Sequence, residues 1–463
     1  MSVPAKRTTQ PPRQESRSGD PSFDLGARSI AYDVLLRVRR DQAFLSLVLD
    51  DTLEKNPQVR GDDRGLATEI VYGVTRTRAF LEARTAPFSN RPFSKLEERT
   101  KIVLAIGAYQ ILFLERVPTF AAIHSTVELA KRKIGPHIAG FINAILRKVA
   151  ALREGPALDV FDATVESLPS WIREEAKSVG GDDAIFASHD ALPITLCIPD
   201  ASGAPEVSRE EWLERFREAR PEVQWQAEPY CPTAIRADGL DRVRDLPGYN
   251  TRAWYIQELG SQLLAELLPF GKGARVLDAC AGRGQKARIL DAKCTAVGAE
   301  LVACDLYPQK LDPLRALLSP SVEFVGIDWT VGLGGLEPRG FDAILVDAPC
   351  SGIGTARRRP EILARITREK IEELHLLQVQ VLTNVAKLLR EGGVLLYATC
   401  SILRRECEDV VEAVLAKDST LRSTPFVARP RDLFSPDATR GRLFPTTHGT
   451  DGYFVAQLSR VGD

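Results

Sequence analysis

Two cysteines of this 463-residue chain follow apolar runs and precede small or polar residues, a pattern typical of strand ends that open into loops. Cys350 lies in Asp347-Ala348-Pro349-Cys350-Ser351-Gly352-Ile353-Gly354-Thr355, and Cys400 lies in Ala398-Thr399-Cys400-Ser401. A deprotonated cysteine is a strong nucleophile and can form covalent intermediates. A free cysteine is, however, often only a small buried apolar residue. Position alone therefore leaves a chemical and a structural role open for both thiols.

A second candidate site is the glycine-containing segment Cys280-Ala281-Gly282-Arg283-Gly284-Gln285-Lys286. Glycines let the backbone approach a bound cofactor closely, and a helix that begins there offers unpaired N–H groups. The segment lacks the spacing of a phosphate-binding P-loop, and the third glycine of the dinucleotide fingerprint would fall at Ala287. These exclusions favour a nucleoside cofactor without pyrophosphate, and we predict S-adenosyl-L-methionine. Asp305, about 20 residues beyond the glycines, is the expected acceptor for its ribose.

The elements that position these residues are predicted by a change in the spacing of apolar residues after about residue 251. Apolar runs alternate there with helical stretches, which is typical of a doubly wound, largely parallel sheet. Such a sheet binds its ligand at the carboxyl ends of the strands. Both cysteines would then follow neighbouring strands at the cofactor edge. The four runs are Arg275–Cys280, Leu301–Asp305, Phe341–Asp347 and Val394–Thr399.

Residues 25–155 show a different pattern, with apolar residues at helical spacing such as Ile30, Val34, Leu35 and Val38. We predict an all-α bundle of six or seven helices. Residues 1–24 are rich in Pro, Ser, Thr, Gln and Arg and are expected to form a disordered tail.

A small α+β linker domain is predicted over residues 156–250. Pro169, Trp171 and Ile172 open a helix, Ile194–Ile198 is a candidate strand, and Glu210–Glu218 is amphipathic. The remaining residues, 251–463, make up the predicted α/β domain, so the fold class is multidomain.

Composition and charge narrow the function classes. With 44% hydrophobic and 27% charged residues the chain is an ordinary globular protein, and it has neither an apolar run long enough for a membrane span nor a secretion signal. We expect a cytoplasmic monomer without a membrane partner. The eight cysteines form no CxxC pair, so neither disulfides nor a metal site are expected. The net charge is −1, but residues 25–155 hold 21 Lys and Arg against 14 Asp and Glu, a net of +7 that suggests a polyanionic partner.

The two cysteine motifs together resemble the paired signature of the Sun/Fmu family of RNA 5-methylcytosine methyltransferases. Two further stretches of that family occur in order, Gln257-Glu258-Leu259-Gly260-Ser261-Gln262 and His448-Gly449-Thr450-Asp451-Gly452-Tyr453-Phe454. The helical part is similar to the antitermination factor NusB. Its matching stretches are Val117-Pro118, Ala122-Ile123, Thr126-Val127-Glu128-Leu129-Ala130-Lys131 and Phe141-Ile142-Asn143-Ala144-Ile145-Leu146-Arg147.

The resemblance implies a Rossmann-like catalytic domain that uses S-adenosyl-L-methionine to methylate carbon 5 of a cytosine in small-subunit (16S) ribosomal RNA. Thiolate addition to carbon 6 makes carbon 5 nucleophilic, and the resemblance assigns this thiolate to Cys400. It gives Cys350 a role in product release, and it places Asp347 near ring nitrogen 3 and within the cofactor set. Asp305 and Asp328 match positions that contact ribose and adenine. Lys286 is a candidate positive neighbour of the nucleophile.

RNA contacts are expected from cationic side chains in two places. The run Arg357-Arg358-Arg359 follows Cys350 closely, where guanidinium groups can meet phosphates. Further candidates lie in the helical domain, namely Arg37, Arg39, Arg40, Lys131, Arg132 and Lys133.

The chain departs from the family pattern at two places. Ala281-Gly282-Arg283-Gly284-Gln285-Lys286-Ala287 stands where the family has Ala-Ala-Pro-Gly-Gly-Lys-Thr, which should alter cofactor affinity more than reaction type. Leu196-Cys197-Ile198-Pro199-Asp200 lacks the usual arginine, and we interpret Cys197 as a packing residue. The alternative is a non-catalytic RNA-binding or ribosome-assembly protein with a degenerate cofactor loop. A small-molecule methyltransferase would explain neither the second thiol nor the basic helical domain.

Overall fold

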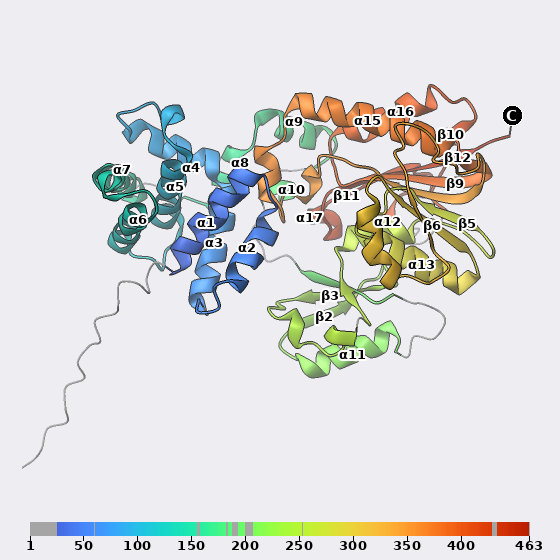
Figure 1. The fold of residues 1–463 in the computed structure, drawn as a ribbon, viewed down its shortest axis with the longest axis horizontal. Coiled ribbons are helices and arrows are strands. Elements are labelled where there is room, and N and C mark those ends of the chain that lie inside the picture. Colours follow the sequence, from blue (N-terminus) through green and yellow to red (C-terminus); the bar gives the residue numbers. More distant parts are fainter. Residues whose placement is uncertain are drawn as a thin grey trace, which may run out of the picture. The chain divides into compact units, whose positions relative to one another are not determined.

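A computed structural model describes residues 26–59, 61–154, 158–181, 184–187, 193–199, 207–251, 253–427 and 433–462. The tail predicted for residues 1–24 lies outside this part. The chain divides into two compact units, one up to Leu158 and one from Asp159 onward (Figure 1).

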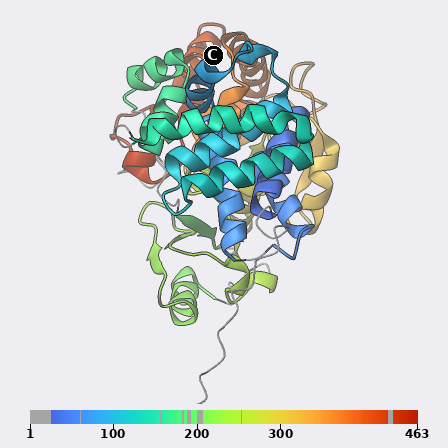
Figure 2. The ribbon, with the colours of Figure 1, turned by 90° about the vertical axis from the view of Figure 1, so that its left-hand side faces the viewer.

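The first unit is a helical bundle (Figure 2). Its centre is α5, in which residues on every side are buried because the sequence is apolar all round the helix. Helices α1, α4, α6 and α7 pack against α5. Within residues 26–59 and 61–154 there are seven α-helices, as predicted: α1 (Gly26–Asp41), α2 (Leu45–Glu54), α3 (Asp62–Arg76), α4 (Arg78–Thr85), α5 (Glu98–Phe113), α6 (Thr119–Lys133) and α7 (Ala139–Ala151).

The second unit begins with helices and a small sheet. The helices are α8 (Val160–Ser167), α9 (Ser170–Ser178), α10 (Ala184–Ala187) and α11 (Arg209–Ala219). Four antiparallel strands follow the order β2-β3-β1-β4, and they are β1 (Ile194–Cys197), β2 (Gln224–Ala227), β3 (Ala234–Asp238) and β4 (Tyr255–Ile256). A capping box at Ser208 and Glu211 starts α11, whose Phe216 stacks on Trp225 of the sheet. The predicted α+β content is confirmed.

The main sheet of the second unit has eight strands in the order β10-β12-β9-β8-β5-β6-β7, with β11 beside β12. Strands β5 to β9 are parallel, whereas β10, β11 and β12 run antiparallel. The strands are β5 (Arg275–Asp278), β6 (Glu300–Asp305), β7 (Glu323–Gly326), β8 (Phe341–Asp347), β9 (Leu389–Thr399), β10 (Leu421–Ser423), β11 (Arg440–Leu443) and β12 (Tyr453–Arg460).

Helices cover both faces of this sheet, so the doubly wound prediction is confirmed (Figure 1). One apolar cluster joins α12 and α13 to the sheet, and another joins α15 and α16 to it. The helices of this part are α12 (Leu259–Glu266), α13 (Gln285–Val297), α14 (Pro308–Leu311), α15 (Arg368–Ala386), α16 (Glu408–Leu415) and α17 (Pro445–His448).

The strand order places a ligand site at one edge. Strand β5 pairs with β6 on one side and with β8 on the other, so the chain order reverses there. A sheet of this kind binds ligands outside the carboxyl ends of its strands at such a reversal. In the β8–β9 pair Asp347 lies opposite Ala398, which brings the loops that carry Cys350 and Cys400 together.

Candidate active site

A pocket of about 460 Å³ lies at the carboxyl ends of β5, β8 and β9. It combines the glycine-containing segment after β5 with the loops after β8 and β9 and with the segment before β12. The lining residues are Glu258, Ser261, Asp278, Cys280, Ala281, Gly282, Arg283, Gln285, Lys286, Asp347, Thr355, Arg358, Arg359, Cys400, Asp451 and Tyr453.

The two predicted cysteines are neighbours. The Sγ atoms of Cys350 and Cys400 lie 3.3 Å apart, within hydrogen-bonding distance for sulfur, and both residues are only partly buried. Hydrogen bonding to Cys400, together with burial, holds the pKa of the Cys350 thiol well above its ordinary value. The raised pKa keeps the Cys350 thiol protonated near neutral pH. Either sulfur can donate the hydrogen bond between them, and the Cys400 sulfur is the one that lines the pocket.

Lys286 and Asp347 form an ion pair beside the thiols. Lys286 Nζ donates to Asp347 Oδ2 at 2.6 Å, and the lysine side chain is 12% exposed. Burial lowers the pKa of Lys286, but the charge and the hydrogen bond of Asp347 outweigh burial and raise it overall. The negative charge that Cys400 would carry as a thiolate is a smaller influence that also raises the pKa of Lys286. Lys286 and Cys400 line the same pocket, and the predicted role of Lys286 as a positive neighbour of a nucleophile stays a prediction.

Asp278, the last residue of β5, is a buried carboxyl group of the pocket. It is 1% exposed, and among the described residues no side chain donates a hydrogen bond to either carboxylate oxygen. Burial, followed by the negative charge of Asp347, raises the pKa of Asp278 to about 7. A buried carboxylate without a side-chain donor beside an open pocket is suited to receive a cationic group.

The loop between β5 and α13 keeps a tight turn despite its unusual sequence. Gly284 has φ +78° at the start of α13, where a Cβ would lie 2.4 Å from Leu314 Cδ2. The Gly282 amide donates to Asp305 Oδ2 at 3.0 Å, which ties the loop to the end of β6. The turn is therefore formed without the proline of the family pattern.

The segment before β12 closes the pocket from the other side. Gly354 follows Cys350 in the same loop, and a Cβ on it would lie 1.9 Å from the carbonyl oxygen of Gly452. The Gly354 amide donates to the Cys400 carbonyl at 3.0 Å, and the Gly452 amide donates to the Gly354 carbonyl at 2.8 Å. Glu258 accepts from the Asp451 amide at 2.8 Å and so anchors the same segment to α12.

Not every predicted residue lies in this pocket. Asp305 lies beside it, and its Oδ1 accepts from the Tyr307 amide and pairs with Lys310. Asp328 is exposed, does not line the pocket, and accepts from the amide and hydroxyl of Thr330 as a loop residue does. Cys197 is fully buried in the small sheet and belongs to the packed core.

The arginine run after Cys350 is not a uniformly solvated face. Arg357 is only 8% exposed, so it does not belong to the exposed phosphate-binding surface that the sequence predicted. Arg358 pairs with Asp451 at 3.1 Å, and only Arg359 is exposed. Both Arg358 and Arg359 line the pocket.

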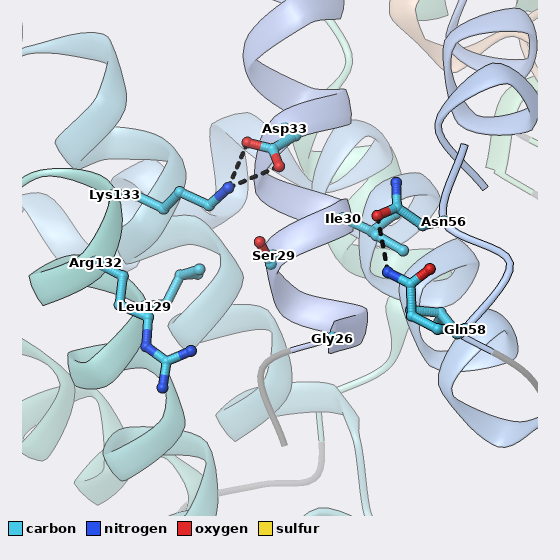
Figure 3. Close-up of a pocket in the computed structure, with 10 residues that line it drawn as sticks. Gly26, Ser29, Ile30, Asp33, Asn56, Gln58, Leu129, Arg132 and Lys133 are labelled. Carbon is cyan, nitrogen blue, oxygen red and sulfur yellow. Dashed lines mark hydrogen bonds and ion pairs between the residues drawn. The ribbon is translucent and has the colours of Figure 1, made fainter. Parts of the chain in front are cut away.

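The cationic candidates of the helical unit lie on its surface, mostly beside carboxylates. The pairs are Arg37–Asp51, Arg39–Glu98, Arg40–Asp41, Lys131–Glu128 and Lys133–Asp33. Arg132 is exposed and lines a pocket of about 210 Å³ together with Ser29, Asn56 and Gln58 (Figure 3). Exposed pairs of this kind contribute little stability, so a phosphate can replace the carboxylate at small cost.

Several pocket residues were not predicted as site residues. The sequence predicts Asp278 only as part of a strand, although its place at the carboxyl end of that strand is a signal for a ligand contact. Glu258 and Asp451 lie in the two family-like stretches, but no role was assigned to them. Within the described residues there is no cluster of potential metal ligands, and no helix there is long and apolar enough to cross a membrane.

The doubly wound sheet with a pocket at the carboxyl ends of its strands, together with the separate helical bundle, defines a multidomain protein with an α/β ligand-binding domain. The family model described as 16S rRNA methyltransferase RsmB/F matches residues 265–459, and the NusB family model matches residues 25–151. The chain belongs to the RsmB/F family of 16S rRNA methyltransferases, as the resemblance predicted.

Relatives of known name support this assignment along most of the chain. The ribosomal RNA small subunit methyltransferase B of Xanthomonas campestris is 32% identical over 412 residues, which cover 86% of this chain and 89% of that protein. The protein of the same name from Pseudomonas syringae is 31% identical over 94% of this chain and 97% of its own length.

Among solved structures, the crystal structure of PH0851 superposes with a TM-score of 0.77 at 20% identity, and covers 96% of this chain and 100% of that one. NSun6 from Pyrococcus horikoshii with SFG gives a TM-score of 0.54 at 18% identity over 65% of this chain and 100% of that one. At these identities the likeness concerns the fold.

Proposed function

We propose that this protein transfers a methyl group from S-adenosyl-L-methionine to carbon 5 of a cytosine in 16S ribosomal RNA, through a covalent bond between Cys400 and the base. The observation that carries the proposal is the 3.3 Å contact between Cys350 and Cys400 beside the Lys286–Asp347 pair. A methyltransferase whose target atom is already nucleophilic would need neither thiol. Two adjacent thiols suit a reaction in which one sulfur adds and the other serves the elimination.

The residues present fit the cofactor. Asp278 offers a buried carboxylate without a side-chain donor, and Asp305 stands at the end of the next strand with the Gly282 amide. We assign the cationic end of the cofactor to Asp278 and the ribose to Asp305. The adenine would extend beyond the pocket lining toward Asp328, a contact that rests on the family resemblance alone. When bound, S-adenosyl-L-methionine supplies the methyl group that carbon 5 receives.

The chain's own groups would act on the cytosine in order. Lys286 stabilises the Cys400 thiolate, which adds to carbon 6 and makes carbon 5 nucleophilic. As negative charge develops on ring nitrogen 3, the Lys286–Asp347 pair neutralises it by passing a proton from the lysine through the Asp347 carboxyl to that nitrogen. After methylation the proton on carbon 5 passes to solvent water, the carbon 5–carbon 6 double bond forms again, and the carbon–sulfur bond breaks. Cys350, which retains a proton at the Cys400 sulfur, returns that sulfur to the neutral thiol as it departs.

The RNA must present an unpaired or flipped base, because the thiol lies inside the pocket. Arg358 and Arg359 at the pocket rim, and the surface cations of the helical unit, would hold neighbouring phosphates.

The reaction is tested with purified protein, naked 16S RNA and cofactor labelled in the methyl group. We expect label in 5-methylcytosine after digestion of the RNA to nucleosides. Label at another atom or on another nucleoside would refute the proposed chemistry. Binding of RNA without any calorimetric heat from S-adenosyl-L-methionine would instead identify the non-catalytic assembly protein.

The acidity of Asp278 predicts how cofactor binding depends on pH. With a pKa of about 7, the carboxyl is mostly neutral at pH 6 and mostly ionised at pH 7.5. A cationic group binds the ionised form better, so affinity for S-adenosyl-L-methionine should rise over this range by up to about tenfold. Calorimetry at both pH values checks this. In D278N the affinity should be lower and nearly flat with pH, whereas an unchanged slope would remove Asp278 from the site.

A further inference from the structure

Glu406 is a fully buried carboxylate that the mechanism above does not use. It ends the short 3-10 turn Arg404–Glu406 between β9 and α16 and is 0% exposed. The Tyr397 hydroxyl fixes this turn by donating to the Glu406 carbonyl at 2.8 Å. Burying a charged side chain is costly unless it is fully hydrogen-bonded. The hydrogen-bond partners of Glu406 therefore indicate which segments this carboxylate holds in place.

Those partners are the residues that directly follow the two cysteines. The Ser351 amide donates to Glu406 Oε1 at 2.7 Å, and the Ser351 hydroxyl donates to Oε2 at 2.5 Å. The Ser401 hydroxyl donates to the same Oε2 at 2.6 Å. One carboxylate therefore links the loop of Cys350 to the loop of Cys400.

The network fixes the direction of each hydroxyl. Ser351 Oγ accepts from the Ile353 amide at 3.4 Å, and Ser401 Oγ accepts from the Leu403 amide at 3.2 Å. Each serine thus receives a hydrogen bond from its own loop and passes one to Glu406. Gln378 of α15 adds a second tie, because its Nε2 donates both to Glu406 Oε1 at 3.2 Å and to the Pro349 carbonyl at 2.9 Å.

We propose that Glu406 is a positioning residue that sets the separation of the two active-site sulfurs by holding Ser351 and Ser401 on one buried carboxylate. This proposal rests on the function proposed above for Cys350 and Cys400. Four donors on two oxygens require an acceptor-only group, which an ionised carboxylate is and an amide is not. The negative charge also belongs to the set of influences that keep the proton on Cys350.

The test compares E406Q with E412Q. Glu412 lies on α16, is about half exposed and pairs with Arg404 and Arg440, so its substitution removes the same charge and leaves the hydrogen bonds of Ser351 and Ser401 to Glu406 in place. In E406Q the amide nitrogen can face the two hydroxyls only if both of them reverse and accept, so the charge-assisted bonds to both cysteine loops are replaced by weaker neutral ones. We expect kcat for methyl transfer to fall by about 10²-fold with little change in KM for RNA or cofactor. E412Q should match the wild type.

A second readout does not need a substrate. The rate at which iodoacetamide alkylates Cys350 and Cys400, followed by peptide mass spectrometry, should depend on pH. Loss of the Glu406 charge should move that dependence to lower pH in E406Q but not in E412Q. A residue that only stabilised the fold would lower the melting temperature without this shift. Wild-type turnover together with a wild-type alkylation profile in E406Q would overturn the proposal.

Single serine variants keep the proposal testable if E406Q does not fold. S401A cuts the tie to the Cys400 loop, and we expect slower adduct formation. S351A keeps the amide bond to Glu406 but loses the hydroxyl bond, and we expect slower product release. Wild-type rates in both variants would count against positioning by Glu406. If the wild-type protein methylates no cytosine, the proposed function fails, while the alkylation profiles still measure the hold of Glu406 on the thiols.

Discussion

Replacing Cys400 with alanine should reduce methyl transfer by a factor on the order of 10⁴ or more, to the limit of detection, because the variant cannot activate carbon 5 by addition at carbon 6. The fold should survive, since Cys400 is small and only partly buried. The measurement is incorporation of labelled methyl groups into 16S RNA under single-turnover conditions. Cofactor affinity, measured by calorimetry, should stay near that of the wild type.

C197A is the matched control for this variant. Cys197 is another free cysteine of the same unit, but it is buried in the small sheet away from the pocket lining. Burial raises its pKa to about 12, which leaves it inert as a nucleophile. C197A should transfer methyl groups normally once its folding is verified. Turnover by C400A at the rate of C197A would end the case for Cys400 as the nucleophile.

Replacing Cys350 with alanine should have the opposite signature, because the first half of the reaction stays intact. The variant lacks the proton donor at the Cys400 sulfur, so the carbon–sulfur bond to the methylated base should break slowly. We expect a protein–RNA complex that survives denaturing electrophoresis and depends on added S-adenosyl-L-methionine. The wild type should show little of this complex.

The double variant C350A/C400A supplies the control for the trapped complex. It should give no stable complex, because the sulfur that forms the bond is gone. A complex of equal yield in the double variant would place the bond on another residue. Absence of a complex in C350A, together with normal turnover, would remove Cys350 from product release.

The sequence predicted the placement of the two cysteines because it depends on short-range signals. The apolar runs before Asp347 and Thr399 identify two buried strands, and parallel strands place their carboxyl ends at one edge. The helical spacing of residues 25–155 likewise predicted the bundle. The 3.3 Å distance between the sulfurs was not predictable, because it depends on how the two loops are held by Glu406.

Contacts between distant segments account for most of what the sequence did not reveal. Arg357, Arg358 and Arg359 resemble a solvated charge run, yet Arg358 pairs with Asp451 and Arg357 is buried. In the sequence Asp278 is an ordinary strand residue. Its pKa is raised by burial in the surrounding core and by the negative charge of Asp347, and neither is visible in the sequence. The antiparallel strands β10, β11 and β12 follow from pairing that no local periodicity encodes.

The close fit of Gly354 against Gly452 has a consequence for synthesis of the protein. Residues 354 and 452 are separated by strands β9, β10 and β11 and by helices α15, α16 and α17, so the ribosome makes the first long before the second. A nascent chain that has emerged only as far as α16 contains both Cys350 and Cys400. It lacks Gly452, against which Gly354 of the Cys350 loop packs. If the chain were released at that stage, the fragment should not methylate RNA.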